Sequence, residues 1–171
     1  MKTWYQESRE AIESLYDKPD LFCDLLAATS PRKQVKANWK LADKIYKAIQ
    51  NREPIPLQGV LPCHKGNIDR AIKGLKLSGK KVCSFAENLK GNLEVVTIDI
   101  WVLRYYGYQE TSLSGKKYDL LADRIRQEAK DAGLKPAEYQ AKIWTIARKQ
   151  SGKNHVSFSS VSEYRQGKLF E

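Results

Sequence analysis

The stretch 75-LKLSGKKVCSFAENLKGNLEVVTIDIWVLRYYG-107 decides the fold that we expect for the rest of the chain. Ser78 is a suitable N-cap for a helix that begins just after it. Apolar residues then follow at i, i+3, i+4 and i+7, the spacing of one helix face: Val82, Phe85, Ala86 and Leu89. The stretch therefore predicts a tight hairpin, an amphipathic helix over 79–90, a short apolar segment and a further helix.

Two lysines, Lys80 and Lys81, stand in the first turn of this predicted helix. A cation is unfavourable there because the helix dipole is already positive at that end. The free N–H groups of the first turn point the same way and can hold an anion. Asp99 follows eighteen residues after Lys81 and is flanked by apolar residues, which indicates a role for this carboxylate beyond solubility.

The totals suit a single domain with a polyanionic partner. A chain of 171 residues is long enough to bury one core, and its formal net charge is +10. We expect a helical domain over 1–151 and a C-terminal tail over 152–171. Basic charge by itself does not select nucleic acid over other anionic partners.

The sequence offers no sign of a membrane, a secretory leader or a metal. It has no window of about 18 apolar residues, and its start lacks the apolar core of a signal peptide. Cys23, Cys63 and Cys83 are odd in number and far apart, which favours reduced thiols and gives no zinc or iron–sulfur spacing. We expect a cytoplasmic monomer without a metal site.

The periodicity along the chain predicts an all-α fold. Ser30 and Pro31 resemble the cap and first residue of a long helix, and three prolines make 51–63 a loop. Helices are expected over 3–16, 19–30, 31–50, 65–73, 79–90, 116–131 and from Pro136, with another beginning at Ile100. The serine-rich tail could be disordered, a short strand or a docked segment.

The order of these elements resembles the helix–hairpin–helix DNA glycosylases, the endonuclease III-like enzymes. The family hairpin L-P-G-V-G-R-K-T aligns with LKLSGKK, matching Leu75, Gly79, Lys80 and Lys81, and the family segment V-D-[TS]-H-[IV]-x-R aligns with IDIWVLR. The lysine-to-aspartate spacing is kept. A second family segment, L-L-S-A-Q-[TS]-x-D-x-x-V-N, resembles AATSPRKQVKAN, with Arg32 at the glutamine position. The chain also resembles small glycosylase-fold proteins of bacteriophages, which implies a bacterial or phage-infected host.

The sequence departs from the family pattern at three places. Lys76 and Leu77 replace the proline and the first glycine of the hairpin, and Trp101 replaces the histidine after the aspartate. The four-cysteine cluster is absent, so no iron–sulfur cluster is expected, and no other cofactor is implied except the monovalent cation that the family often holds at its hairpin. The helix–hairpin–helix itself would cover 65–90.

The resemblance implies that Asp99 and Lys81 are catalytic. A carboxylate beside C1′ of a flipped nucleotide would stabilise positive charge as the base leaves. An amine at that carbon would form a Schiff base and permit strand cleavage at the abasic site. The alternatives are that Asp99 only caps the following helix and that Lys81 is a phosphate-binding or solvated lysine. If Lys80 faces the pocket instead, base removal could survive without strand cleavage.

The remaining candidates would contact duplex DNA. Arg32 matches the family position that fills the gap left by a flipped base, with a plain phosphate contact as its alternative, and Lys33 lies beside it. The hairpin, Leu77, Ser78, Gly79 and Lys80, would hold a phosphate through backbone N–H groups. His64 lacks metal-binding partners, which indicates a surface or DNA-contacting residue. Trp144 and Arg148 fit core and rim, and the further lysines of 31–50 fit a solvated face.

Three functions agree with these features. The first is a DNA N-glycosylase with abasic-site lyase activity, acting on a damaged or modified base in duplex DNA. The second is a non-catalytic helix–hairpin–helix module, which needs the basic face but not Asp99. The third is a glycosylase-fold enzyme that modifies bases in phage DNA.

Overall fold

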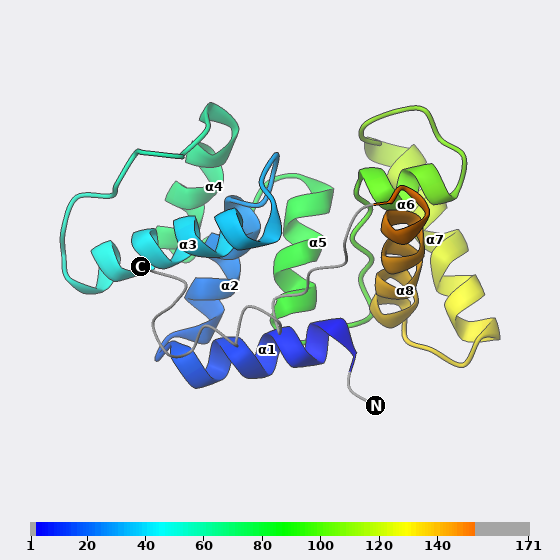
Figure 1. Cartoon of the computed structure of the whole chain (residues 1–171), viewed down its shortest axis with the longest axis horizontal. Helices are drawn as coiled ribbons and strands as arrows, with labels where there is room; N and C mark the ends of the chain where they lie inside the picture. The colour runs from blue at the N-terminus through cyan, green and yellow to red at the C-terminus, as the bar shows by residue number, and fades with distance from the viewer. Residues whose placement is uncertain (1–2, 153–171) are drawn as a thin grey trace.

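The computed structural model describes residues 3–152, and these are all-helical, without a strand, as the sequence predicted (Figure 1). The described part contains eight helices: α1 (Trp4–Leu15), α2 (Pro19–Ala28), α3 (Val35–Gln50), α4 (Pro62–Ile72), α5 (Lys80–Leu89), α6 (Ile100–Tyr105), α7 (Gly115–Asp131) and α8 (Pro136–Gln150). Almost all of the expected tail, 152–171, lies outside the described residues. None of the described helices is long and apolar enough to span a bilayer.

The described residues form two hydrophobic cores, of which the first lies among α1 to α5 and includes Ala137 and Ala141 of α8. Its centre is aromatic: the ring of Tyr16 stacks on Phe22 with 3.7 Å between centroids, and Trp39 and Tyr46 pack around this pair. Figure 1 shows α2, α3 and α4 grouped on the left of the view, with α5 beside them. The amphipathic patterns read from the sequence thus converge on one core, because each of these helices turns its apolar face inward.

The second core is formed by α6, α7, α8 and the segment that leads into α6. Tyr118 on α7 fixes that segment: its hydroxyl donates to the Val96 carbonyl at 2.7 Å and accepts from the Ile98 N–H at 3.1 Å. Val96 and Ile98 are both buried. The apolar residues before Asp99 therefore anchor the carboxylate at the start of α6 rather than continuing into a strand.

Helix α1 connects the two cores, since it packs against α2, α5 and α8. The Tyr5 hydroxyl donates to Gln140 of α8 at 2.7 Å, and the Trp4 ring lies 6.5 Å from Phe85 of α5 and 6.0 Å from Trp144 of α8. In Figure 1, α1 runs along the lower edge beneath α2 and α5, with its first turn nearest to α8. The N-terminal helix thus sets how α5 and α8 face each other.

Two predicted helix starts are wrong. The helix expected from Pro31 begins at Val35, because the Ser30 hydroxyl donates back to the Ala27 carbonyl at 2.8 Å and closes the preceding helix instead of capping the next. The helix expected from Lys65 begins at Pro62, whose ring suits the first helical turn. The C-terminal glycine predicted after α7 is confirmed, with Gly133 at φ +70°.

Candidate functional site

The turn before α5 is fixed by its neighbours rather than by its own serine. Ser78 is not the N-cap: Gly79 occupies that position at φ +89°, where an L-residue would be strained, and no side chain caps the helix. Leu77 is buried in the first core, so its side chain does not reach DNA, and the Ser78 N–H, one of the predicted phosphate donors, donates to Asn67 at 2.7 Å instead. The N–H groups from Gly79 into the first turn have no intrahelical acceptor.

The two lysines of this turn diverge. Lys80 is exposed, and its ammonium lies 2.6 Å from the carboxylate of Asp119 on α7. Lys81 is half-buried, and its positive charge lowers the pKa of Asp99. Lys81 is thus the lysine whose charge acts on Asp99, while the Lys80 ammonium is paired with α7.

Asp99 is the N-cap of α6, as the alternative to a catalytic role predicted. Its Oδ1 accepts from the N–H groups of Trp101 and Val102, each at 3.0 Å. Burial raises the pKa of Asp99 above the ordinary aspartate value, and the Val102 N–H, the Trp144 indole and the charge of Lys81 offset part of that rise. The carboxylate is therefore held by two backbone N–H groups and an indole, and the charge of Lys81 favours its ionised form.

Trp144 packs against the second core and Arg148 is half-buried, as the prediction of core and rim requires, but the sequence did not predict that both would lie near Asp99 and Trp101. The Trp144 side chain hydrogen-bonds Asp99. The Arg148 guanidinium lies 4.9 Å from the centroid of the Trp144 ring and 5.4 Å from that of Trp101. Their i, i+4 spacing was the only signal in the sequence, and it could not show that α6 would bring Trp101 against them.

Helix α4 fastens two of the predicted DNA-contacting loops to one another. Asn67 binds the hairpin twice, accepting from the Ser78 N–H at 2.7 Å and donating to the Ser78 carbonyl at 3.0 Å. One turn earlier, His64 accepts from the Leu61 N–H at Nδ1, 3.1 Å away, and donates from Nε2 to the Pro31 carbonyl at 2.8 Å. We call Asn67 and His64 the α4 bracket.

The prediction that His64 lies on the surface is wrong, because its side chain is fully buried. Its role is to hold the α2–α3 loop, which presents Arg32 at an exposed position and at φ +60°. A positive φ is uncommon for arginine and indicates a backbone that its surroundings constrain. Lys33 closes the turn through its N–H, which donates to the Ser30 carbonyl at 3.1 Å.

The net charge of the chain is concentrated in one segment. Residues 31–81 contain 13 lysines and arginines against 3 acidic residues, so their formal charge equals the +10 of the whole chain. The other 120 residues have 17 basic and 17 acidic side chains and are balanced. The α2–α3 loop, α3, α4 and the hairpin thus form the positive part of the molecule, and Lys81 is its last residue.

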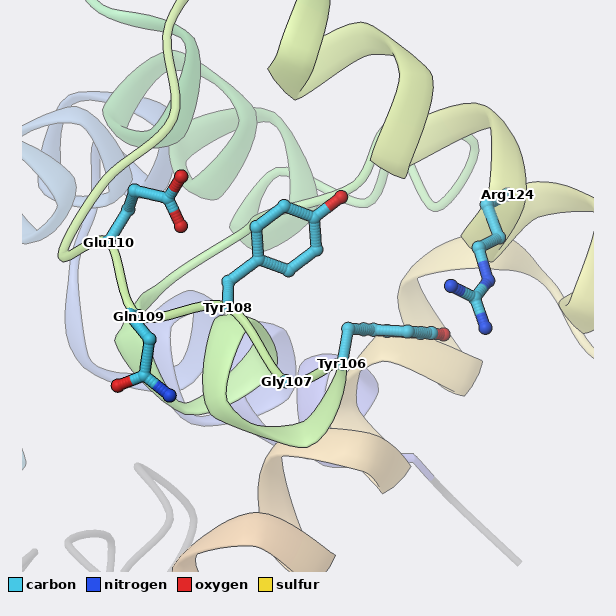
Figure 2. A pocket seen from close by; sticks show the side chains of 6 residues that line it. All are labelled: Tyr106, Gly107, Tyr108, Gln109, Glu110 and Arg124. Atoms are coloured by element: carbon cyan, nitrogen blue, oxygen red, sulfur yellow. The ribbon is translucent and has the colours of Figure 1, made fainter.

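Two hollows lie elsewhere on the described surface. One, of about 690 Å³, is lined by the loop after α6 and by Arg124, and Figure 2 shows Tyr106 directed toward that arginine, whose guanidinium lies 4.7 Å from the ring centroid. The other, of about 460 Å³, lies between the hairpin, α5 and α7 and includes Lys80 and Asp119. Neither is lined by Lys81 or Asp99.

A protein-family model matches residues 2–151 of the chain. The chain belongs to DUF7178, a family of unknown function. No curated protein and no solved structure matches this DUF7178 chain. The described residues of this family member hold no cluster of three or more histidine, cysteine or acidic side chains that could bind a metal ion.

Proposed function

We propose that this DUF7178 protein is a DNA N-glycosylase with abasic-site lyase activity that acts on a flipped-out nucleotide in duplex DNA. The proposal is carried by the placement of Lys81 in the first turn of α5 and of Asp99 at the N-cap of α6, close enough that the charge of the lysine lowers the pKa of the half-buried carboxylate. It is supported by the position of Lys81 at the end of the segment 31–81, whose formal charge is +10.

Asp99 would act on the bond between sugar and base. As that bond breaks, the base leaves with the electron pair and the sugar develops positive charge at C1′. A carboxylate fixed by two backbone N–H groups and an indole needs little reorganisation to stabilise that charge, and its burial strengthens the interaction.

Lys81 would then act as the nucleophile. Its amine, once deprotonated, bonds to C1′, the sugar ring opens, and an imine forms between lysine and sugar. Loss of a proton from C2′ then expels the 3′ phosphate and cuts the strand. Lys80 is unsuited to this role because its ammonium is paired with Asp119 on α7.

The DNA would be held by the α2–α3 loop and the start of α5. Arg32 projects from a constrained turn and would enter the gap in the duplex, with Lys33 and the N–H groups of the first turn of α5 on flanking phosphates. Because the α4 bracket joins these two loops, their spacing is set before DNA arrives.

Borohydride trapping on duplex DNA with one abasic site tests the proposal. Reduction of the imine leaves a covalent protein–DNA adduct, which gel electrophoresis detects. We expect the adduct with the wild type and with Lys80→Gln, the matched control, and its loss in Lys81→Gln. Equal adducts from both variants, or none from the wild type, would contradict the assignment of Lys81.

A non-catalytic DNA-binding module is the second candidate, and one observation favours it: capping of α6 alone accounts for an aspartate at position 99. This function predicts tight duplex binding with no adduct and no altered base in any substrate. Chromatography of the nucleosides after incubation with damaged or hypermodified DNA separates it from the glycosylase, which releases a free base, and from a base-modifying enzyme, which leaves a new nucleoside in the strand.

A further inference from the structure

Helix α3 presents a continuous row of lysines on the side away from the core. Lys36, Lys40, Lys44 and Lys47 recur at intervals of four, four and three residues, which keeps them on one helix face. Three of them are exposed and Lys40 is half-buried. The opposite face is buried against the first core through Trp39, Ala42, Ile45 and Tyr46. We call the four lysines the α3 ridge.

The one acidic residue of this helix is directed inward. Asp43 is buried, accepts from the Tyr16 hydroxyl at 2.7 Å, and lies 3.0 Å from the ammonium of Lys47. The negative charge of Asp43 is therefore paired inside the fold, and the exposed face of α3 contains no carboxylate. A solvated helix face usually mixes both signs of charge, so a row of one sign is unusual for a surface with no ligand.

The ridge also continues a surface that already has an anionic partner in the proposed function. Helix α3 starts directly after the loop that presents Arg32 and Lys33, and that loop is fastened to α4 by His64. Figure 1 shows α3 running from the centre of the view to its left edge, away from α6, α7 and α8. A backbone leaving the flipped nucleotide on this side would meet the lysines in succession.

We infer that the α3 ridge is a second DNA contact, which binds the phosphates of one arm of the duplex beyond the flipped nucleotide. The inference rests on the proposed function only in taking duplex DNA as the partner. From Lys36 to Lys47 the helix rises about 17 Å, which corresponds to about five base pairs along one strand. The contact is made to phosphates, so it extends the footprint without adding sequence specificity.

Salt dependence of binding tests the ridge. The triple variant Lys36→Gln, Lys40→Gln, Lys44→Gln removes three charges and leaves Lys47 in place, because Lys47 neutralises the buried Asp43. The matched control Lys116→Gln, Lys130→Gln, Lys142→Gln removes three exposed lysines from α7 and α8 and gives the same net charge. Both are measured by fluorescence anisotropy on a duplex with an uncleavable abasic analogue, after thermal melting shows that they fold.

We expect the ridge variant to reduce the slope of log K against log salt by about 2.7 and the control to leave it nearly unchanged. Between 50 and 200 mM salt, the wild type should therefore lose about 40-fold more affinity than the ridge variant. Equal reductions in the two variants would overturn the inference, because they would show an effect of net charge alone. So would an unchanged slope in the ridge variant.

Shortening the DNA gives an independent readout. Removing about five base pairs from one arm should weaken the wild type but not the ridge variant, whereas removing them from the other arm should affect both alike. Equal effects of both truncations on both proteins would refute the ridge. Failure of borohydride trapping with the salt and length effects intact would refute the lyase and leave the ridge standing. If the ridge variant loses as much binding to anionic vesicles as it loses to DNA, a membrane surface would replace DNA as the partner of the α3 ridge.

Discussion

The starts of α5 and α6 are two helix N-termini with opposite chemistry. At α6, the Asp99 carboxylate accepts from two backbone N–H groups, so the positive end of the helix is neutralised from within. At α5, Gly79 offers no side chain, and two lysines add positive charge to an uncapped end. The first turn of α6 is thus capped within the fold, whereas the first turn of α5 has no side-chain cap and depends on Asp119 of α7 to pair one of its two lysines.

The largest expected effect comes from removing the charge of Asp99 while keeping its cap. Asparagine caps a helix about as well as aspartate, so Asp99→Asn should preserve the start of α6. If the carboxylate stabilises the transition state, base release should fall by about 10³-fold or more with duplex affinity nearly unchanged. Single-turnover kinetics and a binding titration on the same DNA measure both. Full activity in Asp99→Asn would reduce Asp99 to a cap.

The two N-termini should also differ in what a cap contributes to stability. Asp99→Ala removes the acceptor of two N–H groups and should lower the free energy of unfolding by about 1–2 kcal/mol. Ser78→Ala should change it by less than about 0.5 kcal/mol, because the Ser78 side chain does not cap α5. Urea denaturation at neutral pH gives both values. A loss in Ser78→Ala as large as in Asp99→Ala would reverse the comparison.

The starts of α5 and α6 show which structural features could be predicted from the sequence. Local patterns predicted the all-α class, the hairpin and the aspartate at the start of α6, because periodicity and capping act within a few residues. The same rules failed at Ser78, whose N–H and carbonyl are both bound by Asn67 eleven residues earlier, and at Ser30, which closes the preceding helix. At Ser78 hydrogen bonds to another helix replace the predicted cap, and at Ser30 a bond to the end of the preceding helix does so.

The candidate site was less accessible to sequence reasoning because its members come from distant helices. The 18-residue spacing suggested Lys81 and Asp99, but nothing local linked Trp144, 45 residues beyond Asp99, to that carboxylate. The prediction that His64 lies on the surface failed for the same reason, because its hydrogen-bond partner is the Pro31 carbonyl, 33 residues away. Burial and long-range partners decide these roles, and a single sequence does not contain them.

The α4 bracket offers a smaller test of how the open end of α5 is positioned. Asn67→Ala releases both hydrogen bonds to Ser78, so the first turn of α5 should lose its fixed spacing from the Arg32 loop. We expect duplex affinity to fall about fivefold, the equivalent of one hydrogen bond. Asn92→Ala is the matched control, since Asn92 accepts a loop N–H at 3.1 Å beyond the other end of α5. A fivefold loss in both would point to general destabilisation.

The smallest effect concerns pH, and it follows from the burial of Asp99. Because burial raises the pKa of Asp99 in the folded state, the native protein binds its proton more tightly than the unfolded chain does. This contribution to stability is present below the unfolded pKa and is lost as pH rises through the folded one. Asp99→Asn lacks this contribution, so the stability of the wild type relative to Asp99→Asn should decline between about pH 3 and neutrality.

Urea unfolding of both proteins across that range isolates the effect of Asp99, since the pKa shifts of other groups cancel in the difference between the two free energies of unfolding. If the stability of the wild type relative to Asp99→Asn instead grows with pH, then Lys81, Trp144 and the two N–H groups stabilise the ionised carboxylate by more than its burial costs.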